Sequence, residues 1–222
     1  MKSINNYIEH TILKSDASVS DIEKIAKEAR EYGFLGVCIN PNYVELAHNL
    51  LSDTNVKIVT VVNFPLANNT VDMTKYQIEH VLNYGADEID TVINLSALKS
   101  KNYKLVEDDI KQTKAACEGH NLKVILETDL LTKEEIKLAC EISTQAGADF
   151  VKTSTGFIKG GVGAKVEDIK LMYETVSPYG LGVKASGGIK NYKQAIDLIN
   201  AGASRLGASS GVEIMLGEVQ NV

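Results

Sequence analysis

The stretch Gln145-Ala-Gly-Ala-Asp-Phe-Val-Lys152 decides the fold, because it ends a helical pattern and enters an apolar run within three residues. A glycine adopts the left-handed backbone that such a helix end favours without a Cβ clash. The arrangement recurs at Tyr32-Gly33, Tyr84-Gly85-Ala-Asp87 and Ala201-Gly202-Ala-Ser204. A predicted strand follows each of these four sites, which indicates one repeated helix-to-strand unit.

Eight short apolar runs alternate with longer amphipathic segments along the chain. Most runs are continuous, which is typical of parallel strands buried on both faces. The predicted strands are Tyr7–Leu13, Leu35–Asn40, Lys57–Phe64, Glu88–Asn94, Leu122–Glu127, Phe150–Thr155, Leu181–Ser186 and Arg205–Ser209.

Helix starts between these strands are marked by capping patterns. Ser20-x-x-Glu23 and Thr132-x-x-Glu135 are predicted capping boxes, and Asn40-Pro41 places an N-cap residue before a first-turn proline. Further helical patterns cover Val71–Asn83, Tyr103–Glu118, Lys165–Val176, Asn191–Asn200 and, more briefly, Gly211–Leu216.

Eight strand–helix units in 222 residues fit one closed α/β barrel, a (β/α)₈ TIM barrel spanning residues 1–222. An open doubly wound sheet usually has fewer strands and carries a glycine-rich turn after its first strand. No such turn follows the first predicted strand of this sequence. Gly180-Leu-Gly-Val-Lys-Ala185 fits a dinucleotide-binding pattern, but it leads into a strand instead of from a strand to a helix. We therefore predict a single domain without a linker.

The amino-acid composition limits the classes of molecule that the protein is expected to bind. The net charge is −6, aromatic residues make up 6% and Trp is absent, which disfavours nucleic acid and a membrane surface as partners. The N-terminus lacks the apolar core of a signal peptide, and no run approaches the ~18 apolar residues of a membrane span. Three cysteines without paired spacing indicate a reduced, cytoplasmic protein. The sequence is compatible with a homodimer.

Two lysines, Lys152 and Lys184, lie inside neighbouring apolar runs, where lysine is rare unless it is paired. Each lysine could also extend its ammonium to solvent or form a salt bridge. Two ammonium groups ~5 Å apart at an effective dielectric constant of ~20 repel by ~3 kcal/mol, which lowers the pKa of one amine below its ordinary ~10.4. A neutral amine attacks a carbonyl to form a Schiff base. The pattern leaves open which lysine is the nucleophile.

Other polar residues lie at the carboxyl ends of the predicted strands, where barrels carry their chemistry. Asp90 lies within an apolar run; it is interpreted as a proton shuttle and as a structural partner of a lysine, two roles that are compatible. Glu9, Thr11 and Thr153 are predicted to contact the substrate. Cys38 ends the second strand and is interpreted as a small buried hydrophobe, although a reactive aldehyde could modify it if it faces the barrel mouth.

Glycine-rich segments follow the last two predicted strands, Ser186-Gly-Gly-Ile-Lys190 and Gly207-Ala-Ser-Ser-Gly211. Backbone N–H groups at such turns bind a phosphate dianion, and barrels place phosphate sites in these two loops. A Gly-Gly pair is also compatible with a simple tight turn. The predicted phosphate-binding residues are Gly187, Gly188, Gly207, Ser209, Ser210 and Gly156, with Lys159 completing the site.

These segments resemble the 2-deoxyribose-5-phosphate aldolase family over essentially the whole chain. The matching motifs are Phe150-Val-Lys-Thr-Ser-Thr-Gly156, Val183-Lys-Ala-Ser-Gly-Gly188, Gly85-Ala-Asp-Glu-Ile-Asp90, Ile8-Glu-His-Thr11 and Arg205-Leu-Gly-Ala-Ser-Ser-Gly211. The resemblance implies a class I aldolase, without metal or other cofactor, that reversibly cleaves 2-deoxy-D-ribose 5-phosphate into acetaldehyde and D-glyceraldehyde 3-phosphate. It implies that Lys152 forms the Schiff base, Lys184 is its like-charged, proton-relaying neighbour and Asp90 is a shuttle acting with a water.

The chain departs from the family pattern at two places. Glu9 occupies a position where the family usually has Asp. A longer side chain would therefore take part in the proton relay near the first strand. Some members end in a Tyr that reaches the active site, whereas this sequence ends Glu218-Val-Gln-Asn-Val222, which predicts slower turnover if proton abstraction depends on that Tyr.

Three alternatives remain open from the residues. The nearest is another Schiff-base aldolase or a transaldolase that uses a longer keto donor on a phosphorylated sugar. A metal-dependent epimerase would need histidine and carboxylate ligands, but the four histidines show no ligand spacing. The third is a phosphate-binding regulatory barrel in which both lysines are ion-paired and inert.

Overall fold

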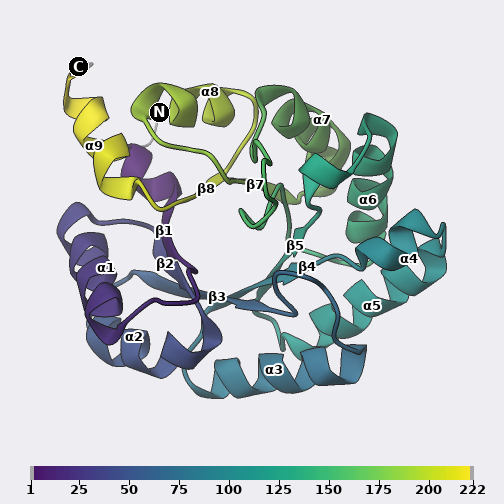
Figure 1. Ribbon diagram of the computed structural model, residues 1–222, viewed down its shortest axis with the longest axis horizontal. Coiled ribbons are helices and arrows are strands. Elements are labelled where there is room, and N and C mark those ends of the chain that lie inside the picture. The colour runs from purple at the N-terminus through teal and green to yellow at the C-terminus, as the bar shows by residue number, and fades with distance from the viewer. Residues whose placement is uncertain (1–2, 221–222) are drawn as a thin grey trace.

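Eight parallel strands close into a barrel at the centre of the molecule, and helices surround it (Figure 1). The computed structural model describes residues 3–220. The strands follow one another around the barrel in chain order, so that the first pairs with the last. They are β1 (Ile8–Ile12), β2 (Gly36–Ile39), β3 (Lys57–Val62), β4 (Glu88–Val92), β5 (Asn121–Ile125), β6 (Phe150–Lys152), β7 (Gly182–Ser186) and β8 (Arg205–Ala208). The predicted TIM barrel is confirmed.

Helices connect the strands and cover the outside of the barrel. Their apolar faces pack on the strands, and the main core lies between these two layers. The helices are α1 (Val19–Tyr32), α2 (Val44–Leu51), α3 (Val71–Asn83), α4 (Leu95–Lys99), α5 (Tyr103–Ala116), α6 (Lys133–Gln145), α7 (Val166–Val176), α8 (Tyr192–Asn200) and α9 (Gly211–Gln220). No helix in the described part of the chain has both the length and the apolar character needed to cross a membrane.

One of the two predicted capping boxes is wrong. Ser18, not Ser20, caps α1: its hydroxyl accepts from the N–H of Asp21, whose carboxylate accepts from the N–H of Ser18. The helix begins two residues earlier than predicted. Asp21, at the third helical position, accepts the hydrogen bond from the N-cap backbone that was predicted for Glu23. The second predicted box, at Thr132, is confirmed.

The helix ends conform to the glycine pattern. The four glycines of the repeated unit all have left-handed φ angles, which confirms that each turns the chain from a helix toward the next strand. They are Gly33, Gly85, Gly147 and Gly202. The repeated sequence signal therefore corresponds to one repeated backbone geometry.

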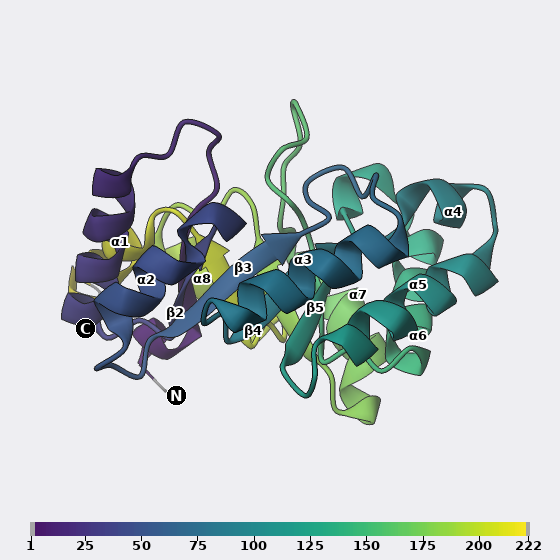
Figure 2. The ribbon, with the colours of Figure 1, turned by 90° about the horizontal axis from the view of Figure 1, so that it is seen from below.

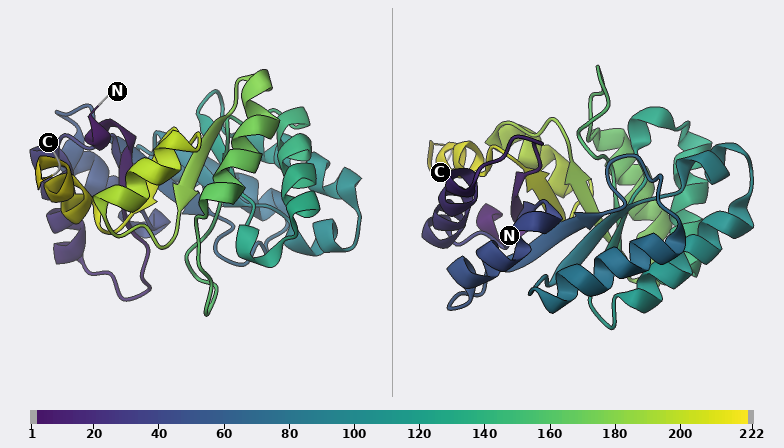
Figure 3. Two further views of the ribbon diagram at one scale, coloured as in Figure 1. Left: turned by 90° about the horizontal axis from the view of Figure 1, so that it is seen from above. Right: turned by 60° about the horizontal axis from the view of Figure 1, so that its bottom comes forward.

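Loops that follow the carboxyl ends of the strands rise on one side of the barrel. In Figures 2 and 3 the longest of them is the green segment between β6 and α7, which projects beyond the other loops. The loops after β3 and β6 touch through Phe64 and Phe157, whose ring centroids are 5.3 Å apart. At the other end of the chain, Glu218 of α9 accepts hydrogen bonds from Ser3 and Ile4, so the two terminal segments lie side by side. In the C-terminal tail 218–222, for which the sequence predicts no terminal Tyr, residues 221 and 222 lie outside the described residues.

Candidate active site

The strand register brings the two predicted lysines together. Lys152 of β6 pairs with Lys184 of β7, and Asp90 of β4 pairs with Lys123 of β5. Residues paired across adjacent parallel strands share a face of the sheet. All four side chains are buried, Lys152 retaining 2% of its exposure and the others none.

Asp90 links the lysines through both of its carboxylate oxygens. Its Oδ2 accepts from Lys152 Nζ at 2.8 Å and from Lys184 Nζ at 2.7 Å. Its Oδ1 accepts from Lys123 Nζ at 3.1 Å. Because the amines of Lys152 and Lys184 share one oxygen, they lie within the sum of these two distances, about 5.5 Å, of each other. The expected juxtaposition of the two amines is therefore present.

Two further carboxylates complete the buried charge cluster. Glu9 forms a close ion pair with Lys184 and lies 3.6 Å from Lys123. Glu88 lies 2.7 Å from Lys123. Neither Lys123 nor Glu88 was among the predicted site residues, although Lys123 lies in an apolar run just as Lys152 and Lys184 do. Applying the same criterion to every strand would have found it.

The cluster fixes which groups stay charged. Burial alone would raise the pKa of Asp90, but Lys123, Lys152 and Lys184 hold it well below its ordinary value. Burial alone would lower the pKa of Lys184, but Asp90 and Glu9 more than offset this and raise it. Lys184 is therefore an ammonium ion throughout the physiological range.

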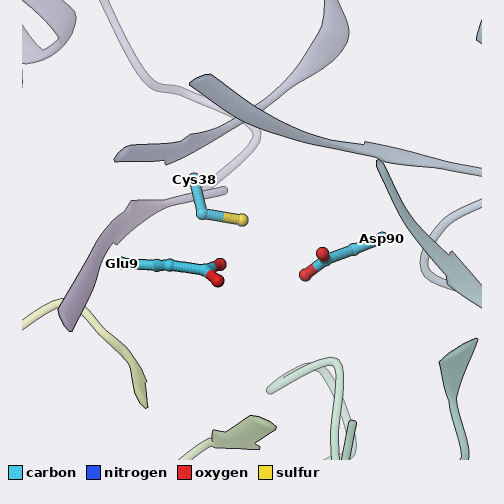
Figure 4. Close-up of side chains that lie close together, drawn as sticks. All are labelled: Glu9, Cys38 and Asp90. Carbon is cyan, nitrogen blue, oxygen red and sulfur yellow. The ribbon is translucent and has the colours of Figure 1, made fainter. Parts of the chain in front are cut away.

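Glu9, Cys38 and Asp90 point toward one another inside the barrel (Figure 4). Their potential ligand atoms lie within 4.8 Å of each other, a spacing compatible with a metal ion. However, Lys123 and Lys184 already contact the two carboxylates, so a cation would have to displace ammonium groups. The donor set does not fit a metal site. Burial raises the pKa of the Cys38 thiol, and Cys38 is fully buried instead of facing the mouth.

A cavity of about 480 Å³ opens above the cluster at the carboxyl ends of the strands. Eight predicted site residues line it: Thr11, Lys152, Gly156, Gly187, Gly188, Gly207, Ser209 and Ser210. The cavity therefore joins one buried amine to the glycine-rich segments that follow β7 and β8.

Other predicted residues lie outside this lining. Asp90, Lys184 and Glu9 form the layer beneath the cavity, and Thr153 is buried with its hydroxyl donating to the Ser186 carbonyl oxygen. Lys159 does not line the cavity either. The lysines that do line it, besides Lys152, are Lys14 and Lys190, neither of which is a predicted site residue. Both lie in loops, where a lysine is common and does not interrupt an apolar run.

Glu127 shapes the loop that follows β6. Its backbone is left-handed, with φ 59°, and its buried carboxylate accepts from the N–H of Thr155 at 3.1 Å and from the Thr155 hydroxyl. The Thr155 hydroxyl oxygen in turn accepts from the N–H of Phe157. These contacts fix the turn at Gly156, beside the cavity. Burial raises the pKa of Glu127.

Comparison with known proteins gives matches along almost the whole chain. The DeoC/LacD family aldolase profile matches residues 4–217. The deoxyribose-phosphate aldolase of Lactococcus lactis subsp. cremoris is 52% identical over 98% of this chain and 98% of its own length. That of Clostridium tetani is 50% identical over 96% of this chain and 97% of its own.

Solved structures agree with these sequence matches. An aldolase named QR15 superposes with a TM-score of 0.94 at 38% identity, covering 100% of this chain and 98% of its own. The tetrameric deoxyribose phosphate aldolase of Aeropyrum pernix gives a TM-score of 0.87 at 32% identity, covering 99% and 92%. Fold and relatives together define a barrel lyase that makes or breaks carbon–carbon bonds. The chain belongs to the DeoC/LacD family of aldolases.

Proposed function

We propose that this chain is a class I deoxyribose-phosphate aldolase, a single barrel domain over residues 1–222, in which Lys152 forms the Schiff base. One observation carries the assignment of the nucleophile. Among the three buried lysines of the cluster, only Lys152 lines the cavity, while Lys123 and Lys184 lie beneath it. A substrate aldehyde in the cavity therefore meets the amine of Lys152 first.

The charge cluster places a second amine and a shared carboxylate beside Lys152. Two ammonium groups no more than about 5.5 Å apart at an effective dielectric constant of ~20 repel by ~3 kcal/mol or more. Lys184 keeps its proton, because Asp90 and Glu9 raise its pKa. Asp90 Oδ2 accepts from both nitrogens and is the path for a proton between them.

The reaction follows from this arrangement. The Lys152 nitrogen attacks C1 of the open-chain sugar phosphate, and loss of water gives a protonated imine. Removal of the proton from the C3 hydroxyl group breaks the C2–C3 bond and releases D-glyceraldehyde 3-phosphate. The electron pair of the broken bond stays with C2, which becomes part of an enamine on Lys152. Protonation of C2 and hydrolysis release acetaldehyde and the free amine. Asp90, with Lys184 and a water, moves these protons.

The phosphate end of the substrate fits the glycine-rich side of the cavity. Gly187, Gly188 and Gly207 line the cavity there, and Ser209 and Ser210 precede the first residue of α9. Backbone N–H groups before a helix N-terminus favour an anion. This end of the cavity therefore orients the sugar with its aldehyde toward Lys152.

The cellular setting is also part of the proposal. All three cysteines are unpaired and buried, which supports a reducing cytoplasm. A homodimer stays a prediction that light scattering would test. Acetaldehyde and phosphorylated sugars are the expected small-molecule partners.

The proposal is tested by trapping the imine. The protein is incubated with acetaldehyde and borohydride, digested and analysed by mass spectrometry. We expect a reduced two-carbon adduct on Lys152 and its loss in Lys152→Arg. Adducts confined to surface lysines would contradict the assignment. Comparing acetaldehyde with dihydroxyacetone as donor distinguishes this reaction from that of an aldolase or transaldolase specific for longer donors.

A further inference from the structure

The lining of the active-site cavity is cationic in an otherwise acidic protein. Among residues 3–220, those that line it include three lysines, Lys14, Lys152 and Lys190, and no aspartate or glutamate, whereas the whole chain has a net charge of −6. Lys152 is held by Asp90 at the base of the cavity. Lys14 and Lys190 are therefore the side chains left to meet a charged group of a substrate.

Lys14 stands between two cavities. It follows β1 and lines both the active-site cavity and a neighbouring one of about 370 Å³ under α1. Its backbone is fixed, because its carbonyl oxygen accepts from the N–H of Ala17 at 3.2 Å. Its side chain is 50% exposed and reaches Asp21 Oδ2 at 3.3 Å. The backbone is anchored while the ammonium lies on the surface.

The pair between Lys14 and Asp21 is easily exchanged. The same carboxylate oxygen of Asp21 already accepts from the N–H and the hydroxyl of Ser18, both at 2.8 Å. These contacts with Ser18 are the main reason that the pKa of Asp21 falls to about 2, and Lys14 contributes less. Exposed ion pairs of this kind add little stability. Asp21 therefore keeps its hydrogen bonds when Lys14 leaves.

A phosphate dianion in the active-site cavity is a better partner for Lys14. It carries twice the charge of a carboxylate, and no carboxylate among the described residues that line the cavity would repel it. Charge-assisted hydrogen bonds to phosphate are among the stronger polar contacts in proteins. We propose that Lys14 is a specificity-determining residue: its ammonium leaves Asp21 and binds the phosphate of the substrate, so that the enzyme selects phosphorylated over unphosphorylated deoxysugars. This inference rests on the proposed aldolase function.

The test compares two substrates that differ only in the phosphate. Cleavage of 2-deoxyribose 5-phosphate and of 2-deoxyribose is measured for the wild-type chain and for Lys14→Gln. The readout is the ratio of kcat/KM for the two substrates. We expect Lys14→Gln to lower this ratio about tenfold or more, the value of one lost charge-assisted hydrogen bond. Lys14→Arg, which keeps the charge, should restore most of the preference.

Lys24→Gln is the matched control. Lys24 is an exposed lysine of α1 that lines only the neighbouring cavity and pairs with Glu28 at 3.7 Å. Its removal should leave the substrate ratio unchanged. An unchanged ratio in Lys14→Gln, or an equal fall in Lys24→Gln, overturns the role of Lys14 while leaving the aldolase proposal intact. Failure of the wild-type chain to cleave either substrate overturns both.

Discussion

Lys152 and Lys184 lie opposite each other on β6 and β7, and both donate to Oδ2 of Asp90. The two amines are equivalent in register but not in surroundings. Lys184 also contacts Glu9 in the closed interior, whereas Lys152 lines the cavity. One carboxylate oxygen thus connects an amine that keeps its charge to an amine that can meet substrate.

Replacing Lys184 tests the like-charge argument. Lys184→Leu removes the neighbouring positive charge and the proton donor, and we expect kcat to fall by ~10²–10⁴. The pH–rate profile should move to higher pH, because repulsion no longer favours the free amine of the nucleophile. Steady-state kinetics across pH measures both effects, and circular dichroism confirms that the variant is folded. A profile that stays in place would rule out this electrostatic account.

Asp90→Asn separates imine formation from proton transfer. The amide keeps the shape of the side chain but cannot accept a proton at neutral pH. We expect turnover to fall by ~10² while borohydride trapping on Lys152 persists. Kinetics and mass spectrometry on the same preparation measure the two properties. If a folded Asp90→Asn variant loses both turnover and trapping, Asp90 is also needed to form the imine, and the prediction is wrong.

Lys123 is predicted to be a stability determinant. It is fully buried between Glu88 and Asp90, so Lys123→Met leaves buried carboxylates short of a partner. Breaking a buried pair in this way costs about 3–5 kcal/mol, which urea unfolding measures. The control is Lys111→Met, which removes an exposed pair with Glu107 and should cost under ~0.5 kcal/mol. Equal effects for the two variants would contradict the prediction.

The same cluster predicts acid lability. Burial alone would raise the pKa of Asp90 and of Glu88, but neighbouring cations lower both. A lowered folded pKa means that stability is present at neutral pH and is lost as pH falls below the ordinary carboxyl value of ~4. Melting temperatures should therefore drop from about pH 4 downward, and Glu88→Gln should flatten that drop. A profile of Glu88→Gln parallel to the wild type would argue against a role for Glu88.

The cysteines should be inert in the folded protein. Cys38, Cys117 and Cys140 are buried, and burial raises the pKa of each thiol, that of Cys117 to about 12. We expect a bulky aromatic disulfide reagent to titrate none of them rapidly in native protein and all three after denaturation. Rapid native labelling of Cys38 would show that the barrel interior opens to the cavity.

Sequence patterns predicted the elements well because their signals are local. Apolar runs, caps and terminal glycines act within a few residues, and the boundaries of α3 match Val71–Asn83. The error at Ser20 arose where two similar capping patterns overlap and only the backbone decides between them. The two catalytic candidates in apolar runs were visible for the same reason, since a lysine in such a run is locally anomalous.

The sequence by itself determined the repeated strand–helix unit, the lysines and the glycine-rich segments. Only the tertiary structure decided that Lys152 faces the cavity, that Lys184 lies beneath it, and that Lys123, Glu88 and Glu9 balance the buried charge. Barrel closure and strand register bring these side chains together from β1, β4, β5, β6 and β7. Such contacts join residues far apart in the chain, so residue patterns alone leave open which amine meets substrate, and only the family resemblance indicated Lys152 from the sequence.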